Sequence, residues 1–283
     1  MTVAVVTITH DRTAHLLRQR EGLAGGPPDL HVVVGMGEEP DPAALPGLPP
    51  VVTMHVPVGG AGLPLAAARN AGAAAAGAAG ADVLVFLDVD CIPAPALVHR
   101  YAAAARAVPG PALLCGPVAY LPPPGPAGYP RAGLDRLAGP HPARPAPPDG
   151  AVLRDDRFAL FWSLSFAVTR ASWELFGGFH EGYVGYGGED TDFALTAQQA
   201  GAGLHWVGGA TAYHQHHRPA RETPSRAAEI VRNARLFRGR NGWWPMAEWL
   251  HAMHDRGWVV FDPDRDLLEI GRAGARTPTG RTA

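Results

Sequence analysis

The sequence predicts an α/β fold, in which a mostly parallel, mixed sheet is flanked by helices. Short apolar, β-branched runs such as Val3–Thr9 and Val83–Leu87 are typical of buried strands. They alternate with longer segments such as residues 64–79, whose many alanines are typical of helices. With 283 residues, 47% of them hydrophobic, the chain can bury the core of one large domain or of two small ones.

In the first half, strands and helices alternate in order. We expect strands at residues 3–9, 30–34, 51–56 and 83–87, and helices at residues 12–22, 64–79 and 95–107. Asp11 is placed to cap the first helix, and Pro95 stands near the start of the third, where proline is favoured. This alternation indicates parallel strands joined by helical crossovers.

The second half is less regular. Residues 122–150 are rich in Pro, Gly and Ala, which predicts a mobile loop. We expect strands at residues 158–168, 203–207, 210–214 and 258–261, and helices at residues 171–176, 189–200, 223–239 and 245–257. The polar residues from Gly271 onward are expected to be frayed.

Composition excludes several classes of function. The net charge of −2 gives no reason to expect binding to nucleic acid or to a membrane surface. All 24 basic residues are arginine, which excludes Schiff-base chemistry and a phosphate loop that depends on lysine. Cys91 and Cys115 have neither metal nor disulfide spacing, so we expect a reducing compartment. Because we see no signal peptide and no apolar run long enough to span a bilayer, we expect a soluble, cytoplasmic protein.

The first acidic motif follows the strand at Val83–Leu87. Asp88 and Asp90 are two residues apart at its end, so their side chains point to the same side if the strand geometry persists. Ligands of parallel sheets bind beyond the carboxyl ends of the strands, where carboxylates suit Mn²⁺ or Mg²⁺. The alternative is an acidic turn after a strand.

The second acidic motif is Gly187-Gly188-Glu189-Asp190. Two glycines allow the backbone to approach a ligand closely, and both carboxylates are expected at a helix N-terminus. We interpret this segment as the place of a general base. The alternative is an ordinary helix cap.

Other polar residues are candidates to complete the site. His214, His216 and His217 lie close in sequence, and imidazole ligates Mn²⁺, so we expect one histidine to close a metal site; a solvated turn is the alternative. A second group of polar residues is expected to contact a nucleotide and its phosphates: Thr9, His10 and Arg12 after the first strand, and Arg69 and Asn70 in the Ala-rich helix. For Arg12 an exposed side chain after a helix cap is the alternative. Arg69 is expected to face a ligand because no carboxylate lies near it in the helix.

Aromatic residues form two groups. Trp243, Trp244, Trp249 and Trp258 are expected to form a core for the C-terminal helices, with a sugar platform or a partner surface as alternatives. Phe161, Trp162 and Tyr186 lie nearer the acidic motifs and are candidates to stack on an acceptor sugar.

A metal site beside a base site suggests transfer of a group away from a phosphate leaving group, and we interpret the chain as a nucleotide-sugar glycosyltransferase. A metal-dependent nucleotidyltransferase or pyrophosphohydrolase is one alternative. A non-catalytic subunit that binds nucleotide-sugar is another.

Several motifs resemble those of GT-A-fold glycosyltransferases of family 2, with a second half similar to the C-terminal region of galactosyltransferases. The segment from Thr9 to Leu16 resembles the Phe-Arg-Asn-Arg-x-x-His-Leu segment of β-1,4-galactosyltransferases. Asp88-Val89-Asp90 resembles their Asp-Val-Asp metal motif, and the segment from Gly185 to Asp190 resembles their Gly-Trp-Gly-Gly-Glu-Asp motif. Arg69-Asn70 resembles an Ala-Arg-Asn element common in family 2.

The resemblance implies a role for each matching residue. Asp90 would bind Mn²⁺, with Asp88 contacting the ribose or the metal. His214 or His217 would complete the metal site, because these histidines have the spacing of the family's Met-x-x-His pair. Asp190 would be the catalytic base, with Glu189 positioning the acceptor. The donor would be a UDP-hexose, and a glycan, a glycolipid or a small-molecule hydroxyl would be the acceptor.

The chain departs from the family at several positions. His10 stands in place of an Arg, Tyr186 in place of a Trp, and the segment from Gly35 to Glu38 lacks the Asp that often reads uracil. We expect a glycosyltransferase domain over residues 1–218, comprising a nucleotide-binding half (1–120), the Pro-rich loop (121–150) and an acceptor half (151–218). A helical extension without a counterpart in the animal galactosyltransferases would occupy residues 219–283.

Overall fold

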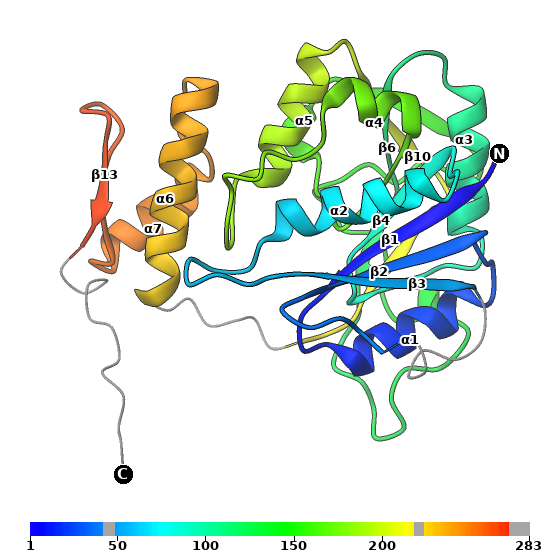
Figure 1. Cartoon of the computed structure of the whole chain (residues 1–283). Helices are drawn as coiled ribbons and strands as arrows, with labels where there is room; N and C mark the ends of the chain where they lie inside the picture. The colour runs from blue at the N-terminus through cyan, green and yellow to red at the C-terminus, as the bar shows by residue number, and fades with distance from the viewer. Residues whose placement is uncertain (42–48, 218–223, 272–283) are drawn as a thin grey trace.

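The computed structural model describes residues 1–41, 49–217 and 224–271. Within them, a large mixed sheet has the strand order β3-β2-β1-β4-β9-β6-β10-β8 (Figure 1). Its strands are β1 (Val3–Thr9), β2 (Leu30–Met36), β3 (Val51–Val56), β4 (Val83–Leu87), β6 (Ala112–Cys115), β8 (Val152–Asp155), β9 (Ser165–Thr169) and β10 (Gly203–Val207). β3, β2, β1 and β4 pair in parallel, whereas β9 runs antiparallel to both of its neighbours. The predicted mostly parallel, mixed sheet is confirmed.

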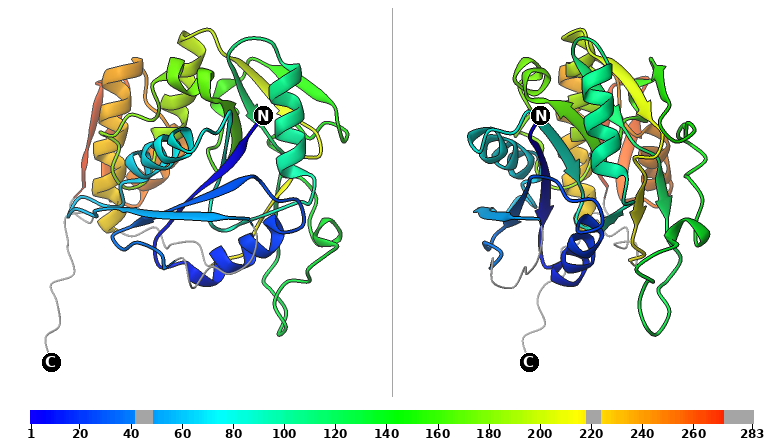
Figure 2. Two further views of the ribbon diagram at one scale, coloured as in Figure 1. Left: turned by 45° about the vertical axis from the view of Figure 1, so that its right-hand side comes forward. Right: turned by 90° about the vertical axis from the view of Figure 1, so that its right-hand side faces the viewer.

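Helices cover both faces of the sheet. The helices of the main body are α1 (Thr13–Leu23), α2 (Leu65–Ala78), α3 (Leu97–Ala107), α4 (Arg170–Phe176) and α5 (Glu189–Gln199). Because side chains alternate along a strand, Val6 and Phe86 face a core shared with α2, α4 and α5, whereas Val5 and Val85 face α3. Figure 2 shows α2 and α3 on opposite sides of the sheet.

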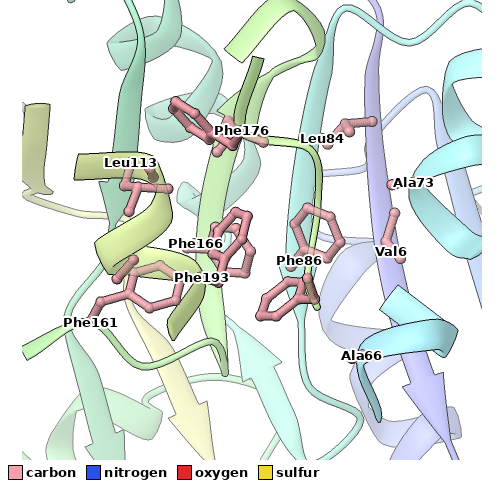
Figure 3. Close-up of a cluster of buried hydrophobic side chains, with 14 of the residues drawn as sticks. Val6, Ala66, Ala73, Leu84, Phe86, Leu113, Phe161, Phe166, Phe176 and Phe193 are labelled. Carbon is pink, nitrogen blue, oxygen red and sulfur yellow. The ribbon is translucent and has the colours of Figure 1, made fainter. Parts of the chain in front are cut away.

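Two features tighten the core beneath α2. Gly72 of α2 lies so close to the sheet that a Cβ there would be 2.4 Å from Cγ1 of Val6. Next to this contact, Phe86 stacks on Phe166 with ring centroids 4.6 Å apart (Figure 3). Burial of such aromatic side chains stabilises the fold and fixes the end of β4, where the first acidic motif begins.

A small second sheet lies beyond the end of β4. It has the order β5-β11-β7, formed by β5 (Cys91–Pro93), β11 (Ala212–His214) and β7 (Val118–Tyr120). Its register places His214 opposite both Cys91 and Tyr120. The sheet therefore brings the histidine-rich segment to the first acidic motif.

The C-terminal segment packs beside α5. It consists of α6 (Pro224–Asn241), α7 (Ala247–Asp255) and a hairpin of β12 (Val259–Asp262) and β13 (Leu267–Ile270), drawn in orange and red in Figure 1. Ile230, Leu250 and Phe261 belong to a small core of its own. Among the described residues, no helix is long and apolar enough to cross a membrane.

The structure corrects several predicted elements. Residues 158–168 are not one strand. The 3₁₀ helix η3 (Phe158–Leu160) precedes β9, and both Phe158 and Phe161 are buried without strand geometry. Five short strands, β5, β6, β7, β8 and β13, were not predicted. Over residues 122–150 the regular structure is η2 (Leu134–Arg136), whose Leu134 is buried. The predicted helix start at Thr223 and frayed end at 272–283 fall outside the described residues.

Candidate active site

Three side chains form a candidate metal centre. Oδ2 of Asp90 lies 3.5 Å from Nε2 of His214 and 3.3 Å from Nε2 of His217. One ligand atom from each lies within 4.8 Å of the others, so a single cation can contact all three. One carboxylate and two imidazoles suit Mn²⁺, and three protein ligands leave positions free for a substrate. The exposed His216 is not part of this group.

The electrostatics of these groups suit a cation. Burial lowers the pKa of His214, which favours the neutral imidazole that a metal ligand requires. Burial raises the pKa of Asp90, but the hydrogen bond from His217 and the positive charges nearby, among them that of Arg12, outweigh it. The pKa of Asp90 therefore lies below its ordinary value, and the carboxylate is ionised.

The first acidic motif is a turn. The N–H of Cys91 donates to the carbonyl oxygen of Asp88 at 2.8 Å, so the strand geometry expected to place both aspartates on one side does not persist. Asp90 faces the histidines, whereas Asp88 accepts a hydrogen bond from Arg69 at 3.1 Å. Of the two aspartates, Asp90 belongs to the metal group.

A buried polar chain holds this turn from behind. Gln19 of α1 donates to the carbonyl oxygens of Asp88 at 2.7 Å and Cys91 at 3.2 Å. Its own Oε1 accepts from the hydroxyl of Thr7 at 2.9 Å, and that hydroxyl pairs with the buried His31. Burial and the charge of Arg20 lower the pKa of His31 to about 3, so the imidazole is neutral. Such a connected chain fixes the position of the turn.

Arg69 joins the two acidic motifs. Its guanidinium is almost fully buried, 3.1 Å from Oδ1 of Asp88 and 3.6 Å from Oε1 of Glu189. Arg69 was expected to face a ligand because no carboxylate lies near it in the helix, but the fold supplies Asp88 and Glu189 from elsewhere. Asn70, also predicted to contact the donor, instead uses its amide on the backbone of Phe179 and on Glu181.

The glycines of the second motif adopt a backbone conformation that side chains rarely allow. Gly185, Gly187 and Gly188 all have positive φ, of 75°, 106° and 88°. Gly188 is the N-cap of α5, so Glu189 and Asp190 lie in its first turn, where negative charge is favoured. The helix-cap alternative is wrong, because no side chain among the described residues caps this helix start; Asp190 lies inside α5 and accepts a hydrogen bond from the N–H of Thr191 at 2.7 Å.

Burial makes these carboxylates weak acids. Burial, together with the charge of Asp190, raises the pKa of Glu189 to about 7. Burial also raises the pKa of Asp190. The pKa of Asp88 rises to about 6, mainly through burial, with smaller contributions from Asp90 and Asp190. The two motifs therefore lie close enough to act on each other, and a carboxylate with a raised pKa is a stronger base.

The residues after β1 lie beside the metal centre. Thr9 is buried at the end of β1, and His10 pairs through Nδ1 with the carbonyl oxygen of Met36 at 2.8 Å. The charge of Arg12 contributes to the lowered pKa of Asp90, behind burial and the histidines. His15 is a neighbour that sequence reasoning missed: burial and Arg12 lower its pKa, and Asp90 raises it. His15 lies in the segment that resembles the β-1,4-galactosyltransferases, but no local sequence pattern connects it with Asp90.

The structure places the aromatic candidates in different environments. Phe161 is fully buried in the main core and cannot form a sugar platform. Trp162 is half-buried, edge-on to His141, whereas Tyr186 is exposed. Of the C-terminal tryptophans, Trp244 and Trp258 pack against the small core, as expected. Trp243 and Trp249 are 44% and 45% exposed, so the core prediction is wrong for both.

Sequence reasoning also missed the contacts of α6 with the second motif. Glu229 accepts a hydrogen bond from the N–H of Tyr186 at 3.1 Å. The fully buried Asn233 donates to the carbonyl oxygens of Val184 and Tyr186, both at 3.1 Å. These side chains are about 45 residues away in sequence, and no local pattern marks them.

One family model matches part of the chain. The model described as the N-terminal domain of galactosyltransferase matches residues 154–218. This segment carries the glycine-rich loop, Glu189 and Asp190 of α5, and both histidines of the metal group. No curated protein sequence matches the chain.

Solved glycosyltransferases share the fold. GalNAc-T7, crystallised with UDP, GalNAc and Mn²⁺, has a TM-score of 0.55 and 17% identity over 90% of this chain and 50% of that chain. S. aureus TarS 1–349 has a TM-score of 0.55 and 14% identity over 84% of this chain and 64% of that chain. The chain thus spans half of the first and less than two thirds of the second. The fold is that of the GT-A glycosyltransferases, and together with the family match it supports a glycosyltransferase.

Proposed function

We propose that the chain is a metal-dependent, inverting glycosyltransferase that moves a hexose from a UDP-sugar to an acceptor hydroxyl. The observation that supports this most directly is the pairing of two groups at one edge of the sheet. Asp90, His214 and His217 suit a divalent cation, and Asp190, a carboxylate with a raised pKa, lies close enough to Asp88 and Arg69 for its charge to act on both. The structural neighbours add support, because GalNAc-T7 was crystallised with UDP and Mn²⁺, and TarS 1–349 with UDP.

Each residue has a role in the proposed reaction. Mn²⁺ or Mg²⁺ held by Asp90, His214 and His217 would neutralise the charge of the departing diphosphate. Arg12 adds a further positive charge beside it. Thr9 ends β1 and His10 follows it, pairing with Met36 at the end of β2; both would contact the nucleoside, while Arg69 joins Asp88 of the first motif to Glu189 of the second.

Asp190 is the proposed base. It removes the proton of the acceptor hydroxyl as the oxygen attacks the anomeric carbon, while the bond to the phosphate breaks. A single displacement of this kind inverts the anomeric configuration. Glu189 helps to position the acceptor, and Gly187 and Gly188 let the backbone approach it closely. Residues 121–150 are proposed to order over the donor and exclude water. The acceptor, whether glycan, glycolipid or small molecule, stays a prediction.

Calorimetry with UDP, GDP and dTDP, each with and without Mn²⁺, tests the donor class. We expect UDP to bind only with the metal, and Asp90→Asn and His217→Ala to lose this binding. The matched control is His216→Ala, because His216 is exposed and outside the metal group. Absence of metal-dependent binding for all three nucleotides would contradict the proposal.

Product analysis separates the alternatives. Incubation with UDP-galactose and a panel of hydroxyl acceptors should release UDP and give a glycoside of inverted configuration. Release of UMP or a sugar phosphate would instead indicate a nucleotidyltransferase or a pyrophosphohydrolase. Nucleotide binding without turnover, unchanged in Asp190→Asn, would indicate a binding subunit.

A further inference from the structure

Trp249 on α7 lies against the loop of the second acidic motif. Its ring is 45% exposed and stacks on the ring of Tyr186, with centroids 5.8 Å apart and planes 12° from parallel. Tyr186 is itself 42% exposed. Two aromatic rings from segments far apart in sequence therefore stack on each other and present a partly exposed aromatic surface beside this loop.

This surface is rigidly held on the side of Tyr186. Glu229 and Asn233 of α6 bind the N–H and the carbonyl oxygen of Tyr186, at 3.1 Å each. The guanidinium of Arg226, also on α6, lies 5.8 Å from the centroid of the Tyr186 ring. Because these side chains belong to one helix, the ring is held ready before a ligand arrives, which lowers the entropy that binding costs.

The surface begins at the proposed base. The pKa of Tyr186 is raised to about 12, chiefly by burial of its hydroxyl and next by the negative charges of Asp190 and Glu189. Tyr186 stands three residues before Glu189 in the loop that leads into α5, and Trp249 of α7 stacks on its ring. A ligand whose hydroxyl reaches Asp190 would extend over Tyr186 towards Trp249.

We propose that Tyr186 and Trp249 form an outer acceptor subsite that holds the second sugar ring of an acceptor with at least two sugar units. This inference rests on the proposed glycosyltransferase function. One face of a pyranose ring carries C–H groups, which pack well on an aromatic face, and Arg226 can donate to its hydroxyls. A lipid chain fits poorly, because Trp249 is flanked by the exposed, charged Glu248.

The test compares glycan binding by three variants. Each labelled protein, with saturating UDP and Mn²⁺, is applied to an array of mono-, di- and trisaccharides of glucose, galactose, mannose and N-acetylglucosamine, and the best glycans are titrated by calorimetry. We expect Trp249→Ala to bind di- and trisaccharides roughly tenfold more weakly and monosaccharides unchanged. Trp249→Phe should restore most of the binding. Trp243→Ala is the matched control, because Trp243 is equally exposed but packs edge-on to Phe237.

The outcomes separate the subsite from the proposed function. If wild-type protein binds UDP with Mn²⁺ but no glycan of two or more sugars, or if Trp249→Ala binds these glycans like wild type, the subsite is wrong and the glycosyltransferase assignment stands. If wild-type protein does not bind UDP with Mn²⁺, the proposed function itself fails. Since Trp249 is half exposed, its variants are expected to keep wild-type UDP binding, which also confirms that they are folded.

Discussion

Arg69 is the residue on which the two acidic motifs depend. It is 4% exposed and lies between Asp88 and Glu189, which come from β4 and α5. Burial lowers the pKa of Arg69, but the two carboxylates raise it more, so the side chain stays charged. Removing it would leave the buried Glu189 and the half-buried Asp88 without their counter-ion.

We expect Arg69→Gln to lower the free energy of unfolding by about 3–5 kcal/mol, the usual cost of breaking a buried ion pair. Urea denaturation at neutral pH measures this change. Arg106→Gln serves as the control, since Arg106 is exposed on α3 and its loss should change stability by less than about 0.5 kcal/mol. Equal stability of the two variants would show that Arg69 does not balance these charges.

Asp190→Asn should lower kcat by about 10²–10⁴-fold, because the amide cannot accept the acceptor proton. Metal-dependent UDP binding should stay within about twofold of wild type, since Asp190 lies outside the metal group. Steady-state kinetics and calorimetry on the same preparation check both statements. Near-normal turnover would rule out Asp190 as the base.

The pH dependence of kcat/KM should reflect the ionisation of Glu189. Its pKa is about 7, so as the pH falls through 7 the carboxylate pair takes up a proton and activity should fall. Glu189→Gln removes a negative charge beside Asp190, which makes Asp190 easier to ionise. The acid limb of the profile should therefore move to lower pH. A limb that stays in place would show that another group controls it.

At the scale of elements, α6 supports the loop that precedes α5. Gly185 in this loop has a φ of 75°, and a Cβ there would lie 2.4 Å from a carboxylate oxygen of Glu229. A side chain at this position would therefore be strained by the positive φ and would displace Glu229. The segment after residue 223 therefore holds the loop that carries the proposed base.

Gly185→Ala should destabilise the protein by about 1–3 kcal/mol, through its left-handed conformation and through displacement of Glu229. It should also lower kcat, because Tyr186 and the following carboxylates shift. Gly239→Ala gives the contrast: Gly239 lies in α6 with open space around it, so alanine should stabilise by about 0.5–1 kcal/mol. Thermal unfolding and kinetics of both variants measure these effects.

How far the sequence predicts the site depends on distance along the chain. The strand before Asp88, the glycine pair and the helix start at Glu189 follow from local patterns, and the structure has all three. The contacts of Arg69 with Asp88 and Glu189 join residues up to 120 positions apart, and no local rule reveals them. Exposure of Trp249 was missed for the same reason, because it depends on which neighbours reach it.

The whole molecule should respond to Mn²⁺. Binding at 100 times the dissociation constant stabilises the folded state by about 2.7 kcal/mol, which corresponds to roughly 5–10 °C in Tm for a protein of this size. EDTA should reverse the shift. His217→Ala should abolish the shift, and His216→Ala should keep it, because His217 belongs to the metal group and His216 does not. Identical Tm values with and without Mn²⁺ would contradict the metal centre.

The register of the small sheet has a consequence for the order of folding. Asp90 follows β4, whereas His214 lies on β11, far along the chain, and the two meet only when β11 pairs with β5. Closing so long a loop costs entropy that local contacts cannot offset early. We therefore expect refolding chains to gain helices and the first parallel strands before they can coordinate a cation. Metal binding during refolding would therefore begin only after this last long-range pairing. A spectroscopic probe of the bound metal would thus follow completion of the native topology.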